Sequence, residues 1–211
     1  MLARMIVCVA VLFSGVACGI SAQCPPACAG LDLSEKDLQS VDLAGADLRG
    51  TDLSGAKLRN IDLSGANLQG ADLQGADLRG AFLNDVKIDA ETRLDSKWRL
   101  VWDLVNGGGV GRSLSGVDLV EANLWGANLQ QSDLSGAQLY RVDFSQANLA
   151  QANLTGADLN WANLRQANLR GANLAKATLQ WVDARQAILA QVDLTEACLL
   201  YTSDAADDLY T

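Results

Sequence analysis

The sequence predicts an all-β solenoid: a parallel β-helix with square coils, interrupted once by an α-helix. Three observations predict it: a five-residue repeat fills most of the chain, the repeat changes phase once, and the interruption has the apolar spacing of a helix. The 211 residues include 19 glycines and 2 prolines but no histidine. Because histidine is absent, Ser-His, Cys-His and His-metal sites are excluded.

Each repeat unit reads small residue, Asp or Asn, Leu, and two variable residues, of which the last is often Gly. The central residue recurs from Leu33 to Ile88 in twelve units, and from Leu114 to Leu194 in seventeen more. A period of five fits neither a helix nor a plain strand. If each unit forms one side of a square coil with a turn near the Gly, the Leu and the small residue two before it point inward. Backbone groups then pair with the next coil about 4.8 Å away, and the stack buries a thin Leu/Ala core.

These units resemble the pentapeptide-repeat family over roughly residues 31–90 and 114–197. The resemblance implies a right-handed parallel quadrilateral β-helix with four units per coil. It therefore implies three coils in the first block and slightly more than four in the second. The departures are few and leave this prediction unchanged: Phe82 and Lys87 replace Asp or Asn, Phe144 replaces Leu, and Ala184 underfills a core position.

The interruption, residues 91–113, predicts a helix that Ser96 caps and that Asn106 and Gly107–Gly109 end. Its apolar residues recur at i, i+3, i+4 and i+7 and share one face: Trp98, Val101, Trp102 and Val105. One interpretation is a plug, in which this face covers the open end of one block and joins it to the next. The other is a docking helix for a partner.

The N-terminus predicts export. Residues 1–22 combine one charge, a short apolar run and a small-residue end, as in a signal peptide cleaved after Ala22. The alternatives are a buried N-terminal segment or a lipoprotein, in which lipidation at Cys18 would supply the only membrane contact. Residues 23–30 form a leader, where Cys24 and Cys28 either pair as a disulfide or stay reduced. Two thiolates alone do not complete a zinc site.

The C-terminal segment 198–211 breaks the pattern and resembles a translated sequencing adapter. We therefore expect this tail, Cys198 included, to be non-native, and further coils to follow in the natural protein. The alternative is a genuine acidic tail that follows a last half-coil.

The function predicted is an exported, periplasmic or extracellular, non-enzymatic structural or protein-interaction solenoid without a cofactor. Carboxylates recur at the outward position before Leu, where Asp and Asn alternate, which indicates hydrogen bonding to turns and not acid–base chemistry. The net charge of -9 opposes nucleic acid as a partner. The family resemblance implies an alternative, an acidic DNA mimic that inhibits or protects gyrase, and the column Asp32, Asp52, Asp72 is compatible with it. Export opposes that role.

The second block also predicts a contact surface. Alignment at twenty residues per coil stacks the fifth positions Glu121, Arg141, Trp161 and Trp181, with Tyr140 beside Arg141. The two tryptophans are expected about 5 Å apart. One interpretation is that they only stack on each other and shield the backbone hydrogen bonds between coils. The other is a recognition patch for another protein, since Trp, Tyr and Arg anchor interfaces. A self-complementary patch would produce a homodimer. A second column, Gly126, Gln146, Gln166 and Gln186, predicts a polar ladder.

Overall fold

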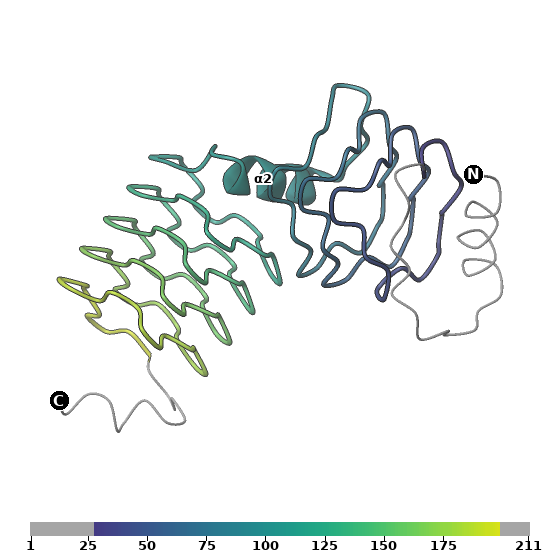
Figure 1. Ribbon diagram of the computed structural model, residues 1–211. Coiled ribbons are helices and arrows are strands. Elements are labelled where there is room, and N and C mark those ends of the chain that lie inside the picture. The colour runs from purple at the N-terminus through teal and green to yellow at the C-terminus, as the bar shows by residue number, and fades with distance from the viewer. Residues whose placement is uncertain (1–27, 199–211) are drawn as a thin grey trace. The chain divides into compact units, whose positions relative to one another are not determined.

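The computed structural model describes residues 28–198. It divides into two compact units, Met1–Arg99 and Leu100–Thr211, and each is a stack of coils (Figure 1). The helix α2, Ser96–Val105, lies between the two runs of coils in the sequence. The predicted signal peptide, Cys18, Cys24 and the tail beyond Cys198 lie outside the described residues, so the predictions made for them stay predictions.

Each side of a coil ends in a tight turn. After Leu53, the Leu53 carbonyl accepts a hydrogen bond from the backbone N–H of Ala56 at 3.1 Å, and Gly55 between them has a φ of 64°. A positive φ at the third residue of a four-residue turn is the type II geometry, which favours Gly. The fifth position of the repeat is therefore the turn position, as the sequence predicts.

The coils pair in parallel at a spacing of twenty residues. Asp52 pairs with Asp32 on one side and Asp72 on the other, and Asp143 pairs with Asn163 in the same way. Around Asp52, the backbone N–H of Leu53 donates to the Asp72 carbonyl at 2.7 Å. The bridges are isolated residue pairs, one on each side of a coil, and not extended strands. Four repeat units per coil are thereby confirmed.

The interior of each coil is filled by the residues expected there. Leu53 and Leu63 at the central position and Ala56 and Ala66 at the small position are all 0% exposed. Phe144, which replaces Leu, is also 0% exposed and is accommodated in the core. Because Leu and the small residue alternate along each side, the core is a narrow column of buried Leu and small side chains.

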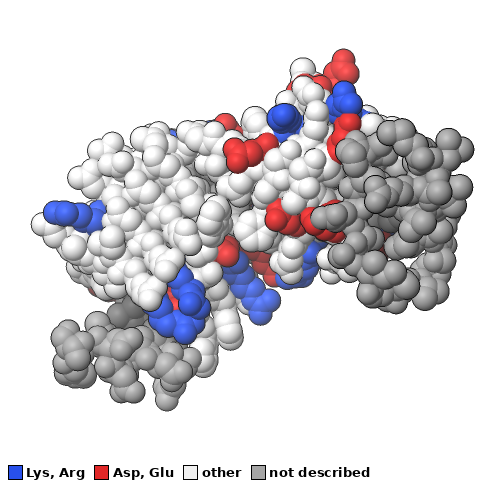
Figure 2. Space-filling model, viewed as in Figure 1, with Lys and Arg blue, Asp and Glu red and all other residues white. Residues whose placement is uncertain are grey.

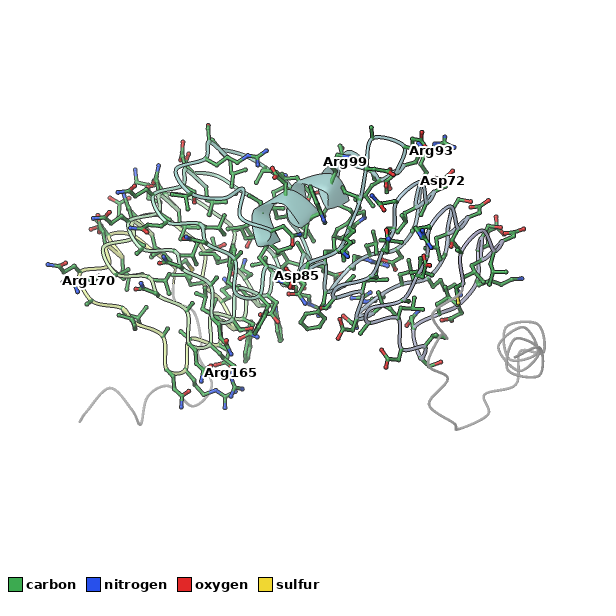
Figure 3. The ribbon with its side chains drawn as sticks, turned by 45° about the horizontal axis from the view of Figure 1, so that its top comes forward. Asp72, Asp85, Arg93, Arg99, Arg165 and Arg170 are labelled. Atoms are coloured by element: carbon green, nitrogen blue, oxygen red, sulfur yellow. The ribbon has the colours of Figure 1, made fainter. Side chains whose placement is uncertain are left out.

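The first run of coils extends to Arg93 and not to residue 90 as predicted. Asp72 pairs with Arg93 across twenty-one residues, one more than elsewhere, and the two side chains form an ion pair of 2.7 Å (Figure 3). The extra residue fits because Asp89 accepts backbone hydrogen bonds from Gly70 at 3.0 Å and from Thr92 at 2.9 Å. These hydrogen bonds, that from Gly70 first, lower the pKa of Asp89 below its ordinary value.

The helix α2 begins at Ser96, within the predicted insertion, but Ser96 is not its cap. The backbone N–H of Arg99 donates to the Asp95 carbonyl at 2.9 Å, the first i to i−4 bond, so Asp95 occupies the N-cap position. Within residues 28–198, no helix is long and apolar enough to cross a membrane.

The glycines that follow α2 end it as predicted. The backbone N–H of Gly108 donates to the Asp103 carbonyl at 2.8 Å, and Gly107 has a φ of 109°. Gly109 is buried, and a Cβ there would lie 2.4 Å from the Asn128 carbonyl oxygen. Close packing therefore requires glycine at 109.

The second run of coils begins earlier than the predicted residue 114. The backbone N–H of Gly111 already donates to the Gln130 carbonyl at 2.8 Å, and Ser113 pairs with Asp133. The last described pair joins Thr178 to Cys198, so Cys198 continues the coil. The helical insertion is therefore shorter than residues 91–113 at both ends.

Candidate functional site

One corner of the second unit carries large side chains at the turn position. The fifth-position residues Glu121, Arg141, Trp161 and Trp181 all have left-handed backbone, with φ of 56°, 56°, 62° and 60°. This conformation costs a residue other than Gly roughly 1–2 kcal/mol. The predicted column therefore holds its side chains on strained backbone. We call these four residues, together with Tyr140, the Trp corner.

The side chains of the Trp corner contact one another from coil to coil. The Trp161 and Trp181 rings are stacked, with centroids 5.3 Å apart and planes at 19°. The Arg141 guanidinium lies 5.7 Å from the Trp161 ring centroid and 5.3 Å from that of Tyr140. Glu121 is 3.7 Å from the same guanidinium. The structure therefore brings together the four residues predicted to bind a partner, Tyr140, Arg141, Trp161 and Trp181. It also confirms the expected spacing of the two tryptophans.

The Trp corner remains accessible although it is stacked. Trp161 is 48% and Trp181 43% exposed, whereas the central leucines from Leu119 to Leu174 are at most 2% exposed. Stacking covers ring faces, but the indole edges and the Arg141 side chain reach solvent. The arrangement can therefore present aromatic and cationic groups to a partner.

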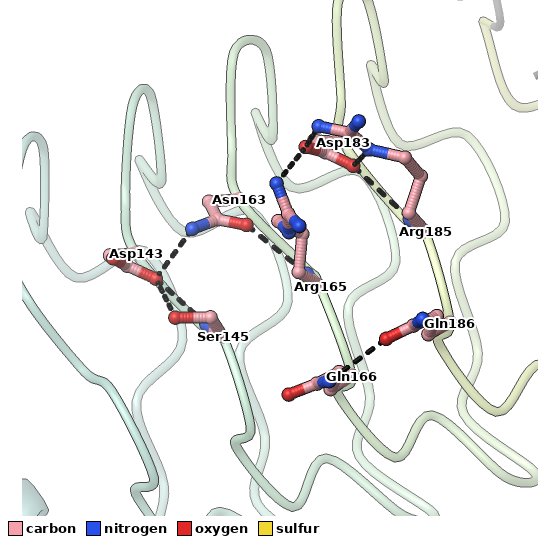
Figure 4. Close-up of polar contacts among 8 residues, drawn as sticks. All are labelled: Asp143, Ser145, Asn163, Arg165, Gln166, Asp183, Arg185 and Gln186. Atoms are coloured by element: carbon pink, nitrogen blue, oxygen red, sulfur yellow. Dashed lines mark hydrogen bonds and ion pairs between the residues drawn. The ribbon is translucent and has the colours of Figure 1, made fainter. Parts of the chain in front are cut away.

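A polar network lies beside the Trp corner, on the side of the coil that follows it (Figure 4). Asn163 donates through Nδ2 to Asp143 at 3.1 Å, one coil away. Asp183 takes a bidentate ion pair from Arg185, at 2.9 and 2.6 Å, and a longer contact of 3.7 Å from Arg165. The hydrogen bonds from Arg185, with other smaller contributions, lower the pKa of Asp183.

Sequence reasoning missed this network. The signal was present, because Arg165 and Arg185 are twenty residues apart and therefore stack on one corner. The adjacent Gln166 donates to Gln186 at 2.8 Å, which confirms part of the predicted polar ladder. Trp125, also not singled out, is 39% exposed on the same corner.

The helix residues proposed as a plug or docking face are mostly covered. Trp98 is 7% and Val101 1% exposed, while Trp102 and Val105 are half-buried. Leu104, which the sequence did not single out, is 0% exposed. The buried face is thus Trp98, Val101 and Leu104. Its burial favours a structural role, although the plug and docking functions both stay predictions.

Cys28 is 1% exposed and disulfide-bonded. Cys24 lies outside the described residues, so its pairing with Cys28 stays a prediction. Cys198, half-buried, is a free thiol.

The outward carboxylates accept hydrogen bonds from the backbone of the turns that follow them. Asp32 accepts from the Ser34 backbone N–H at 3.0 Å and Asp52 from that of Ser54 at 2.9 Å, a pattern that recurs in both units. Hydrogen bonds from Ser135 and Thr195 hold the pKa values of Asp133 and Asp193 below the ordinary value. Among the residues described, no group of three or more His, Cys, Asp or Glu could hold a metal ion. This arrangement suits structural hydrogen bonding.

Comparisons with known proteins identify the repeat. The family model for pentapeptide repeats matches in 8 copies, over residues 28–60, 46–85, 113–151, 132–171, 152–191 and 172–203. No protein with a curated description is significantly similar to the chain.

Several solved structures are similar. A pentapeptide repeat protein from the Arabidopsis thaliana thylakoid lumen is 24% identical, with a TM-score of 0.42, over 50% of this chain and 81% of its own. HetL, involved in heterocyst differentiation regulation in Nostoc sp. strain PCC 7120, is 32% identical with a TM-score of 0.25, over 83% and 75%. QnrB1, a plasmid-mediated fluoroquinolone resistance protein, is 16% identical with a TM-score of 0.25, over 85% and 95%.

The twenty-residue ladder, the inward Leu and the left-handed fifth position agree with the family match, which covers more than half of the sequence. The chain belongs to the pentapeptide-repeat family, and its fold is a right-handed quadrilateral β-helix.

Proposed function

We propose that this protein is an exported, non-enzymatic solenoid that binds another protein through the Trp corner. The observation that carries the proposal is the pair Trp161 and Trp181, which are 48% and 43% exposed at turn positions that favour Gly. Trp, Tyr and Arg are the residues that most often dominate the binding energy of interfaces. The Trp corner supplies all three side by side.

The fold does not need tryptophan at these positions. Gly126, Gly136 and Gly156 make the same turn in the same unit, with φ between 62° and 67°. A stacked aromatic pair contributes about 0.5–1.5 kcal/mol, which is less than the roughly 2–4 kcal/mol that its two left-handed residues cost together. Stacking therefore brings the coil little net stability and leaves the exposed indole edges without a structural role.

A matched pair of double variants tests the Trp corner. Trp161→Gly with Trp181→Gly removes the indoles and introduces the residue that the turn favours, so the coils should remain intact. Gln166→Gly with Gln186→Gly is the control, because those residues lie one corner further on the same coils with φ of 58° and 61°. Affinity capture by the immobilised full-length protein measures partner binding, and sedimentation velocity measures self-association.

We expect association to be lost in the Trp variant and retained in the Gln variant. Loss of self-association would identify the partner as a second copy of the chain. Equal association by both variants and the wild type would refute the proposal.

Export is supported by the composition of residues 1–22, which lie outside the described part of the chain. Fractionation of cells that express the full-length gene tests it. The mature protein should appear in the periplasm or medium and lack residues 1–22. A membrane fraction that releases the protein only with detergent would favour lipidation at Cys18.

The acidic first unit favours the second candidate, a DNA mimic that acts on gyrase. Residues 28–95 contain thirteen acidic and seven basic residues, and Asp32, Asp52 and Asp72 lie on successive coils. In Figure 2 acidic and basic atoms are interspersed over the visible face of this unit, while the visible face of the second unit is mostly uncharged. A supercoiling assay with and without the protein tests this role. If the wild type inhibits or protects gyrase and the triple Asp→Asn variant does not, mimicry replaces the first proposal.

A further inference from the structure

A hollow lies on the corner of the second unit diagonally opposite the Trp corner. The fifth-position column there reads Gln131, Gln151, Gly171, Gln191, so glycine interrupts a run of glutamines. The gap opens a hollow of about 210 Å³, lined by Gln130, Ala150, Gln151, Arg170, Gly171 and Gln191. Its lining contains one formal charge, the guanidinium of Arg170, and no carboxylate.

Arg170 differs from the other arginines of its unit. Within residues 100–198, Arg112, Arg141, Arg165 and Arg185 each lie against a carboxylate, and Arg170 forms no ion pair with a described residue. Its side chain projects from the edge of the unit (Figure 3). An exposed guanidinium beside a hollow, with no acid of its own coil to neutralise it, can pair with an external anion.

The neighbouring amides add donors to the same place. Gln131 donates through Nε2 to Gln151 Oε1 at 3.0 Å, which fixes the Gln151 oxygen toward the previous coil. The Gln151 amide nitrogen then has no acceptor among the described residues. At the position where the next glutamine of the ladder would accept from it, Gly171 has no side chain. Its Cβ, if present, would meet Gln151 Cγ at 3.6 Å, an ordinary contact, so the hollow exists because this residue is Gly.

We propose that this hollow binds a single carboxylate, supplied by an Asp or Glu side chain of a partner protein. Guanidinium and amide N–H groups match a carboxylate in charge and in hydrogen-bonding geometry. A protein of net charge -9 with one cation at the site repels a polyanion more than it attracts it, which disfavours nucleic acid. The inference extends the proposed partner binding to a second surface, but its test is independent of the Trp corner.

The variant Gly171→Gln closes the hollow with the side chain that the ladder already uses. Gln131, Gln151 and Gln191 tolerate the same left-handed turn, with φ of 60°, 59° and 62°, so the coil should fold. The matched control is Gly156→Gln, on another corner, with φ of 66° and open space around its Cβ. A third variant, Arg170→Ala, removes the exposed cation without touching the core, and it carries the test if Gly171→Gln fails to fold.

The probe is sodium acetate, titrated into the full-length protein against sodium chloride at equal ionic strength. Proton–nitrogen NMR follows the side-chain amides of Gln151 and Gln191. We expect saturable shifts with acetate, an apparent affinity at least about tenfold weaker in Gly171→Gln and Arg170→Ala, and no change in Gly156→Gln.

Identical shifts with chloride, or wild-type acetate affinity in Arg170→Ala, would overturn the inference. Inorganic phosphate provides a second arm, and binding of phosphate in preference to acetate would also overturn the assignment to a carboxylate. Since no partner is present in this titration, loss of capture through the Trp corner would leave the result unaffected, and the two proposals can fail separately.

Discussion

The two units share one coil but differ in what they place on its outside. At the second position of the repeat unit, the first run of coils has eight Asp and one Asn, and the second run has six Asp and seven Asn. Among residues 28–198, three residues other than Gly have positive φ at the turn position in the first unit, and twelve in the second. The backbone ladder and the Leu core are alike in both, so the fold permits either choice.

The difference changes how neighbouring coils interact through side chains. In the second unit Asn148 donates to Asn128 at 3.1 Å and Asn168 to Asn148 at 3.2 Å, so the amides form a continuous ladder. In the first unit, Asp52 lies between Asp32 and Asp72 on adjacent coils, and carboxylates cannot donate to one another. The second unit gains lateral hydrogen bonds where the first accumulates like charge.

The largest expected effect is at the helix between the two runs of coils. Trp98→Ala should lower the free energy of unfolding by about 3–5 kcal/mol, the range for a buried aromatic. Half-buried Trp102→Ala should cost less. Urea unfolding of each variant measures the change. If the double variant, Trp98→Ala with Trp102→Ala, keeps the wild-type stability but loses a bound partner, the helix is a docking element and not a structural plug.

A core truncation tests whether the two units have equivalent interiors. Leu63→Ala in the first unit and Leu149→Ala in the second remove side chains that are both 0% exposed. Each should destabilise its unit by about 2–5 kcal/mol, and outward Gln69→Ala should stay within about 0.5 kcal/mol. If Gln69→Ala and Leu63→Ala unfold at the same urea concentration, the inward assignment is wrong.

Exchanging Asp and Asn sharpens the comparison of the outer faces. Asn163→Asp removes the donor to Asp143 and places like charges on adjacent coils, at an expected cost of about 1 kcal/mol. Asp52→Asn, the reverse change in the first unit, should stabilise by about 0.5 kcal/mol or less. Both effects should shrink in high salt, because exposed charges are screened. Effects of the same sign in the two variants would contradict the account.

The smallest expected effect is on acid stability. Hydrogen bonds to Asp32 and Asp193, mainly from the hydroxyls of Ser34 and Thr195, lower their pKa values in the folded protein. A lowered pKa contributes stability that is present above the pKa of the unfolded chain and is lost as pH falls through the folded pKa. Unfolding free energy should therefore be level from about pH 7 to 5 and fall below about pH 4. Ser34→Ala should reduce that fall, and a rise in stability on acidification would contradict the prediction.

The five-residue repeat made the coil predictable from sequence, whereas the local exceptions to the repeat could not be predicted. Register, core and the spacing of Trp161 and Trp181 follow from a period of five, since every unit obeys the same geometry. The end of the first run was missed because Asp89 and Thr92 accommodate one extra residue through hydrogen bonds that no repeat encodes. The N-cap residue is Asp95 and not the predicted Ser96. Both residue types suit an N-cap, so the sequence did not distinguish between them.

The contact surfaces were predicted only in part, for a related reason. Stacking aromatics are evident in a column, and so the Trp corner was found from sequence. The hollow exists because Gly171 has no side chain within a column of glutamines, and Arg170 beside it forms no ion pair with a described residue. Those facts concern pairs of residues on different coils and emerge from the positions of their atoms.

The twenty-residue register also governs how such a chain can change in length. Loss or gain of one five-residue unit would keep every Leu inside, yet it would turn all later residues by a quarter of a revolution. A five-residue deletion between Trp161 and Trp181 would move the second indole onto the corner of Gly136 and Gly156. Deletion of a whole coil would restore the alignment. Natural variation in this protein should therefore preserve its surface columns when it proceeds in steps of twenty residues. Steps of five should rearrange those columns without unfolding the coils.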